Sequence, residues 1–286
     1  NLTGKLAGSE KNRVKTIRLR GNISQGIVAA PSDFANDVPE IANVAVGADV
    51  TALLGIEKYE PPVVLASDAT LHPLPEFVSK YDIEGAQNHV DVVASLMDVP
   101  VIVTEKLEGS HWSMTWLREG DRVVVSQRNY SIEPRADKPH TWFTVSQEMN
   151  LEHTLREMAA ELEPRALTLR GEMLGPGIQA NYYKLKSHTL YLFEIEVDGM
   201  PVDAERFMAL TDKWSLPAVP VLSFGPSLRD WLGEQTLKAA SDGTSKIADR
   251  PREGVVIRPM TEMRTDRLGR TIIKQRGPNY LAKSDF

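Results

Sequence analysis

The chain has 286 residues, 42% of them apolar, and a formal net charge of −6. This length and apolar content suffice to fill the cores of two domains. The apolar runs stay below the roughly 18 residues of a membrane span, and no positively charged segment leads into an apolar one, so we expect neither a membrane protein nor a secretory signal. The lack of cysteine excludes disulfides and thiolate zinc sites and favours a cytoplasmic protein, which we expect to be a monomer.

The first 95 residues consist of short extended pieces separated by turn residues. Apolar Ile17 and Leu19 alternate with Arg18 and Arg20. Further extended pieces are expected at 21–31, 47–56 and 58–66. Short strands of this kind predict a small β-barrel. The proline-rich, polar stretch at 66–89 is expected to connect this module to the rest of the chain.

From residue 100 onward the strand and helix patterns are stronger. Strands are expected at 113–118 and 122–127, joined by a short turn into a hairpin. A helix is expected to begin after Asn150, as its N-cap, because apolar residues recur at helical spacing until Pro164. Other expected elements are strands at 101–105, 166–174, 189–197, 254–259 and 270–276, and helices around 207–214 and 228–232. This interspersed order, without a regular βαβ repeat, predicts an α+β domain over 96–286.

One lysine, Lys106, ends an apolar strand and is followed three positions later by Gly109. The pattern K-x-x-G alone is common, and a surface lysine before a tight turn would explain it. The pattern is significant here because later segments carry acids, bases and an aromatic residue that could line one cleft with Lys106. These segments are SQRN at 126–129, RGEML at 170–174, YLFEI at 191–195, REGVVIRP at 252–259 and IIKQR at 272–276. In this order the segments resemble the motifs of the covalent nucleotidyltransferases, the superfamily of polynucleotide ligases and messenger-RNA capping enzymes.

The resemblance implies a nucleoside-binding group of residues. It makes Lys106 the nucleophile that takes AMP from ATP, Glu172 the acid that binds the ribose hydroxyls, and Phe193 the ring that stacks on adenine. Tyr191 is the alternative stacking residue, and ordinary core packing is the alternative role for Phe193. A lysine amine is nucleophilic only when neutral, and positive neighbours with partial burial would favour that form of Lys106.

The resemblance also implies residues for phosphates and metal. The remaining nucleotide contacts are expected at Thr104, Glu105, Lys274 and Arg276. Many ligases have a second lysine where this chain has Arg276, which keeps the charge but cannot deprotonate. Glu253 and Glu108 are expected to hold Mg²⁺ or Mn²⁺, because hard cations take carboxylate oxygens; a plain turn carboxylate is the alternative for Glu108. Arg128 is expected to bind the RNA 5′-phosphate, with a surface salt bridge as its alternative.

Two features narrow the resemblance to RNA ligases. DNA ligases and capping enzymes usually carry an arginine two places after the motif glycine, whereas this chain has Ser110 and then His111. The segments RLRGNISQG, ADVTALLGIEKYEPP and LPEF are similar to the amino-terminal OB-type module of the Deinococcus- and Naegleria-type RNA ligases. The implied organisation is an OB-like RNA-binding module over 1–95, expected to lack its first strands, and a nucleotidyltransferase domain over 96–286. Arg18 and Arg20 of the module are candidate RNA contacts, although a solvated strand face would also explain them.

The resemblance implies an ATP-dependent RNA ligase that joins a 3′-hydroxyl to a 5′-phosphate through lysyl-AMP and RNA-adenylate, with an expected place in RNA repair. The alternatives are a DNA ligase or a GTP-dependent capping-type enzyme on the same fold, and an RNA-binding relative without catalysis. The histidines show no metal-ligand spacing, and no G-x-x-x-x-G-K-[ST] loop occurs, so neither a histidine metal site nor that phosphate-binding loop is expected.

Overall fold

The computed structural model describes residues 17–19, 22–24, 28–56, 64–65, 68–265 and 268–284. Contacts between residues divide the chain into two units. The smaller unit contains the described residues up to 56, and the larger contains those from 64 onward apart from Leu268. The described residues between 64 and 95 are grouped with the larger unit by their contacts, and the domain boundary after residue 95 stays a prediction.

The smaller unit contains one described pair of strands. β1 (Ile17–Leu19) and β2 (Asn22–Ser24) are antiparallel, and the 3-10 helices η1 (Pro31–Asp33) and η2 (Pro39–Asn43) follow. The extended piece expected at 47–56 is wrong, because this stretch forms turns. Local hydrogen bonds replace strand pairing there: the Thr51 N–H donates to Asp49 Oδ1 at 2.8 Å. The OB-like module remains a prediction; Arg20 lies outside the described residues, and of Arg18 only the backbone, in β1, is described.

An antiparallel sheet of eight strands forms one half of the larger unit, in the order β12-β11-β10-β7-β8-β9-β4-β3. Its strands are β3 (Val64–Leu65), β4 (Ala69–His72), β7 (Ser110–Leu117), β8 (Arg122–Ser126), β9 (Ser131–Pro134), β10 (Ala166–Leu174), β11 (Thr189–Val197) and β12 (Met200–Pro201). The predicted hairpin is confirmed as β7 and β8, joined by η4 (Glu119–Asp121).

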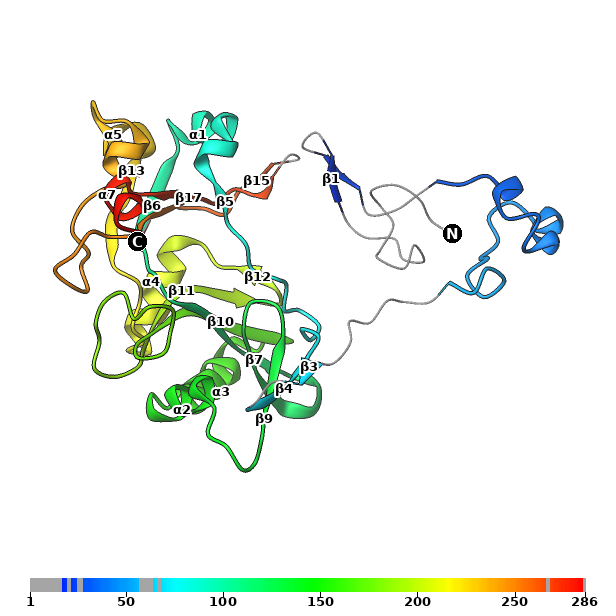
Figure 1. Ribbon diagram of the computed structural model, residues 1–286, viewed down its shortest axis with the longest axis horizontal. Helices are drawn as coiled ribbons and strands as arrows, with labels where there is room; N and C mark the ends of the chain where they lie inside the picture. The colour runs from blue at the N-terminus through cyan, green and yellow to red at the C-terminus, as the bar shows by residue number, and fades with distance from the viewer. Residues whose placement is uncertain are drawn as a thin grey trace. The chain divides into compact units, whose positions relative to one another are not determined.

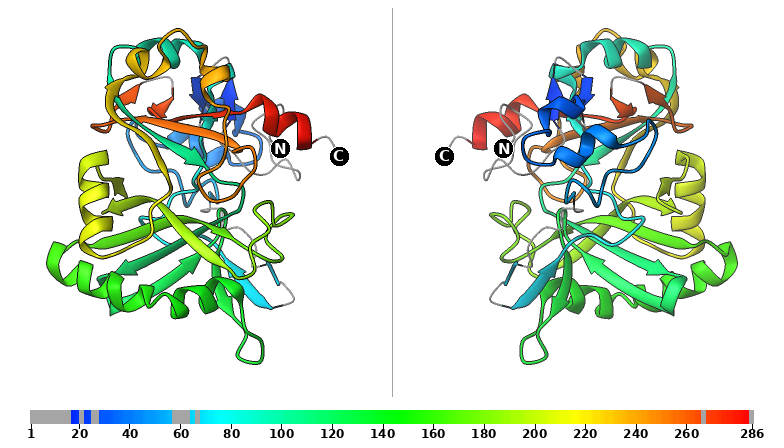
Figure 2. Two further views of the ribbon diagram at one scale, coloured as in Figure 1. Left: turned by 90° about the vertical axis from the view of Figure 1, so that its left-hand side faces the viewer. Right: turned by 90° about the vertical axis from the view of Figure 1, so that its right-hand side faces the viewer.

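Helices cover the apolar face of this sheet. They are α2 (Thr141–Glu148), α3 (Leu151–Leu162) and α4 (Ala204–Lys213), and Figure 2 shows α2 and α3 beneath the green strands. Fully buried Trp112, Leu169, Leu155 and Phe207 join strands and helices in one core. The predicted α3 is confirmed, but its cap is not: Asn150 is left-handed (φ 52°) and makes no capping hydrogen bond through its side chain.

The opposite face of the same sheet is polar and buried. Arg170 is 1% exposed, and its guanidinium contacts both oxygens of Glu196 at 2.9 Å. Two residues before Arg170 in β10, the Thr168 hydroxyl lies 2.9 Å from the hydroxyl of Thr115 in β7. Alternation along the strands separates this face from the apolar one, so the sheet presents polar groups to the second sheet.

The second sheet has five strands in the order β13-β6-β14-β17-β5. They are β5 (Glu84–Gly85), β6 (Pro100–Lys106), β13 (Val221–Ser227), β14 (Gly254–Pro259) and β17 (Ile273–Arg276). The strand predicted at 270–276 is thus shorter, and β15 (Arg264–Thr265) and β16 (Gly269–Arg270) form a separate hairpin (Figure 1). The unit is completed by η3 (Ala86–Asn88), α1 (Val90–Leu96), α5 (Leu228–Leu232), α6 (Leu237–Ala240) and α7 (Pro278–Ser284).

Together the two sheets and their flanking helices form the antiparallel α+β arrangement of a ligase-type nucleotidyltransferase domain, as the sequence predicted. Throughout the described part of the chain, every helix is too short or too polar to cross a lipid bilayer.

Candidate active site

The pairing of three strands brings the predicted basic residues together. β14 lies between β6 and β17, with Gly254 opposite both Lys106 and Arg276. Two residues further along, Val256 is opposite both Thr104 and Lys274. Residues directly opposite one another in antiparallel strands point to the same face, as do alternate residues of one strand. Lys106 and, from a strand far along the sequence, Lys274 and Arg276 therefore emerge on one face of the five-stranded sheet.

Two glycines of the motifs allow backbones to approach closely. A Cβ atom at Gly254 would lie 2.0 Å from the carbonyl oxygen of Gln275, so a side chain there would push β14 away from β17. A Cβ atom at Gly109 would lie 2.3 Å from the carbonyl oxygen of Met173. The loop that follows Lys106 therefore passes directly over the end of β10 and brings the lysine near Glu172.

A buried carboxylate bridges two of the cations. Lys106 Nζ lies 2.8 Å from Glu253 Oε2, and Arg276 Nε lies 3.3 Å from Glu253 Oε1. The Glu253 side chain is 3% exposed, whereas that of Lys106 is 21% exposed and remains accessible from the pocket. Partial burial, followed by the positive charges of Lys106 and Arg276, lowers the pKa of Lys274. Two cations thus pair with the buried Glu253 carboxylate, and a third lies close enough to interact with them electrostatically.

The other two predicted acids lie close to this cluster. Burial raises the pKa of Glu108, and the charge of Glu253 adds to that effect. The Glu108 carboxylate accepts a hydrogen bond from the hydroxyl of Tyr280 in α7, and its backbone N–H donates to the Tyr183 hydroxyl at 3.0 Å. Burial raises the pKa of Glu172 to about 7. Both acids thus hold their protons more strongly than free carboxyls do.

These carboxylates fit a hard divalent cation with few protein ligands. Over the described ranges, no group of three or more histidines and acids is arranged to hold a metal ion. Mg²⁺ commonly binds through one or two carboxylates and takes its remaining oxygens from water and phosphate. Glu253 and Glu108, whose charges influence each other, provide that number of oxygen donors beside Lys106.

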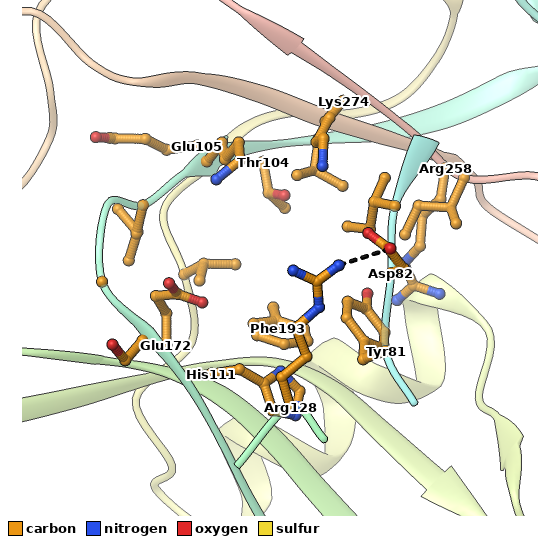
Figure 3. A pocket seen from close by; sticks show the side chains of 18 of the residues that line it. Tyr81, Asp82, Thr104, Glu105, His111, Arg128, Glu172, Phe193, Arg258 and Lys274 are labelled. Atoms are coloured by element: carbon orange, nitrogen blue, oxygen red, sulfur yellow. Dashed lines mark ion pairs between the residues drawn. The ribbon is translucent and has the colours of Figure 1, made fainter. Parts of the chain in front are cut away.

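A pocket of about 400 Å³ opens between the two sheets. Figure 3 shows Lys274 and Thr104 on its upper side and Glu172, Phe193 and His111 on its lower side. Lys106, Glu105 and Arg128 also line it. The Glu105 carboxylate itself is buried and accepts a hydrogen bond from the Lys246 N–H at 2.8 Å.

A β-bulge places Phe193 in this pocket. In the pairing of β10 with β11, Arg170 is opposite Glu194 and Gly171 is opposite Leu192, so Phe193 is the extra residue. Bulges of this kind re-aim a side chain and are common beside active sites. Tyr191, the alternative stacking residue, and Phe193 both pack against the apolar cluster around Tyr183, but of the two it is Phe193 that lines the pocket.

One aromatic residue of the pocket, Tyr81, was not predicted from the sequence. The Tyr81 ring lies 4.9 Å from that of Phe193 and stacks on His111 at 5.6 Å with an interplanar angle of 25°. Burial, followed by the charges of Arg170 and Arg128, lowers the pKa of His111 to about 3, so its imidazole is neutral. Tyr81 belongs to the stretch that was expected only to connect two domains, and no local pattern in the sequence distinguishes it.

Arg128 lies at the pocket, where its Nη2 is 2.6 Å from Asp82 Oδ2. Seven predicted residues line this pocket: Lys106, Thr104, Glu105, Glu172, Phe193, Lys274 and Arg128. Glu253, Glu108 and Arg276 adjoin it at Lys106. The structure therefore brings the predicted residues of the larger unit together, while the proposed RNA contacts of the smaller unit stay predictions.

Comparisons with known proteins agree with this arrangement. The sequence model of the RNA ligase family matches residues 99–276. A Naegleria gruberi RNA ligase variant solved with AMP and Mn is 27% identical, with a TM-score of 0.61, over 95% of this chain and 76% of that chain. A variant of that ligase with ATP and Mn is 28% identical with the same TM-score and coverage. Its structure with PPi is 27% identical, with a TM-score of 0.60, over 96% of this chain and 77% of that chain.

Among curated proteins, none matches the sequence. The family match spans all of the motifs from Lys106 to Arg276 and the pocket residues apart from Tyr81, Asp82 and Ile83. The chain belongs to the RNA ligase family.

Proposed function

We propose that this protein is an ATP-dependent RNA ligase that joins an RNA 3′-hydroxyl to a 5′-phosphate through a lysyl-AMP intermediate on Lys106, as part of RNA repair in the cytoplasm. One observation carries the proposal: in a chain of this family, Lys106 Nζ lies beside buried Glu253 at a pocket that Phe193, Glu172 and Lys274 also line. The binding of ATP and Mn by the Naegleria gruberi RNA ligase supports the choice of nucleotide and metal.

The nucleoside end of the pocket positions ATP. Phe193 offers a ring face to adenine, because base stacking on an aromatic side chain is favourable, and Val256 lies among the pocket residues of the opposite sheet. Glu172 accepts hydrogen bonds from the ribose hydroxyls. Lys274 and Arg276 bind phosphate oxygens, so the α-phosphorus is held near Lys106.

Charged groups surround the proposed nucleophile. Lys106 Nζ lies 2.8 Å from Glu253, which also pairs with Arg276, and the charge of Lys106 acts on Lys274. The amine must part from Glu253 before it attacks phosphorus as a nucleophile. Mg²⁺ or Mn²⁺ held through Glu253 and Glu108 would neutralise phosphate charge and assist the departure of pyrophosphate.

Three displacements at phosphorus follow. The Lys106 amine attacks the α-phosphorus of ATP, which forms a P–N bond and releases pyrophosphate. An oxygen of the RNA 5′-phosphate then attacks the adenylyl phosphorus and breaks the P–N bond, which gives RNA-adenylate. Finally the RNA 3′-hydroxyl loses its proton, attacks the 5′-phosphorus and releases AMP. Each step depends on positioning and on neutralisation of charge by the basic side chains around the pocket.

The decisive experiment uses ATP labelled at the α-phosphate, without RNA. The wild type should give a protein-bound label that survives denaturation, and Lys106→Ala should give none. Lys213→Ala is the matched control, because Lys213 pairs with Glu161 on the surface and its loss should leave labelling unchanged. An unlabelled wild type, or full labelling of Lys106→Ala, would refute the proposal.

Two extensions separate the alternative functions. Labelling by GTP in preference to ATP would indicate a capping-type enzyme, and sealing of nicked DNA in preference to nicked RNA would indicate a DNA ligase. RNA binding that weakens steeply with salt but occurs without any lysine adduct would indicate a non-catalytic relative.

A further inference from the structure

A short segment at residues 79–85, here called the strap, connects the two sheets beside the pocket. At its start the carbonyl oxygen of Ser79 accepts a hydrogen bond from Arg170 of the eight-stranded sheet, at 3.1 Å. At its end Gly85 in β5 pairs in parallel with Lys274 in β17. The strap is therefore anchored at both ends to elements of the proposed active site.

The middle of the strap presents one carboxylate to a basic residue of the pocket. Asp82 Oδ2 lies 2.6 Å from Arg128 Nη2, and the two side chains are 56% and 48% exposed. Figure 3 shows this pair between Phe193 and Lys274. The negative charge of Asp82 also acts on Lys274, since it opposes the lowering of that lysine's pKa by burial, Lys106, Arg276 and Arg128.

A carboxylate in this place competes with phosphate. The guanidinium of Arg128 presents a planar set of donors that fits carboxylate and phosphate oxygens alike. An ion pair as exposed as this one is weak, so a more highly charged anion can replace the carboxylate. The Asp82 carboxylate therefore pairs with Arg128, and a phosphate group that binds Arg128 must displace this carboxylate.

We propose that Asp82 is a specificity-determining residue of the phosphate site: its carboxylate is a displaceable counter-ion of Arg128 that weakens the retention of pyrophosphate. Pyrophosphate released in the first step would otherwise compete for Arg128 with the incoming RNA 5′-phosphate. This inference rests on the proposed function, in which pyrophosphate leaves the pocket before the RNA 5′-phosphate reacts there.

The test measures the affinity of the full chain for inorganic pyrophosphate by calorimetry at low salt. Asp82→Asn removes the charge but keeps the shape, and it should bind pyrophosphate about fivefold more tightly than the wild type, the range of an exposed ion pair. Glu84→Gln is the matched control, because Glu84 lies on the same strap and pairs with His89 at 3.6 Å. Its affinity should equal that of the wild type.

A second pair of variants separates competition at Arg128 from general charge repulsion. With Arg128→Ala present in both proteins, Asp82→Asn should no longer tighten binding. Unchanged or weaker binding by Asp82→Asn alone would overturn the inference, as would the same tightening in the Arg128→Ala background. Because these measurements need no catalysis, their outcome is distinct from a failure of Lys106 to form the adduct.

Discussion

The partly buried acid Glu172 gives a quantitative prediction for the dependence of stability on pH. Burial raises its pKa from 4.5 to about 7, whereas the charge of Lys106 opposes the shift without cancelling it. The folded state therefore binds a proton that the unfolded state has lost between these pH values, so stability falls as pH rises through this range. At about 1.4 kcal/mol per pKa unit, the loss attributable to this carboxyl is about 3 kcal/mol above pH 7.

The perturbation is Glu172→Gln, which keeps the size of the side chain but does not titrate. The free energy of unfolding is measured by urea denaturation of both proteins at intervals from pH 4.5 to pH 8. Below the unfolded pKa the two should differ little in their pH dependence, and by pH 8 the wild type should have lost about 3 kcal/mol relative to the variant.

Comparison of the two proteins cancels other titrating groups. Glu196, whose pKa burial also raises to about 7, is present in both and contributes the same slope to each. Parallel stability curves for wild type and variant would refute the reasoning, because they would show that Glu172 ionises as easily in the folded chain as in the unfolded one.

Three further predictions concern packing and binding. Phe193→Ala should weaken ATP binding by about 1–3 kcal/mol, as measured by calorimetry; an equal loss for Tyr191→Ala would contradict the assignment. Gly254→Ala should destabilise the protein by about 1–3 kcal/mol, because its Cβ meets the next strand, and an unchanged melting temperature would disprove that contact. Arg170→Ala should cost about 3–5 kcal/mol of unfolding free energy, since it leaves buried Glu196 unpaired; a loss under about 1 kcal/mol in denaturation would exclude the buried pair.

Periodic local signals explain why much of the larger unit was predictable. The hairpin of β7 and β8 and the helix α3 follow directly from alternation and from helical spacing of apolar residues. The extended piece at 47–56 failed because side-chain and local backbone hydrogen bonds in that stretch compete with strand pairing. β17 is shorter than predicted because Gly269–Arg270 pairs instead with Arg264–Thr265 in a separate hairpin.

The sequence by itself determined which residue types were available for the chemistry: a lysine before a glycine, three acids, an aromatic and two distal bases in a fixed order. It could not determine their neighbours in space. Strand register alone places Lys106 and Arg276 opposite Gly254, on the two sides of β14, and a bulge whose partner strand lies some twenty residues away directs Phe193 into the pocket. Tyr81 and Asp82 contact Phe193 and Arg128 because the strap runs beside the pocket. The sequence could not predict these contacts, since contacts between residues distant in the chain depend on tertiary packing and leave no periodic pattern.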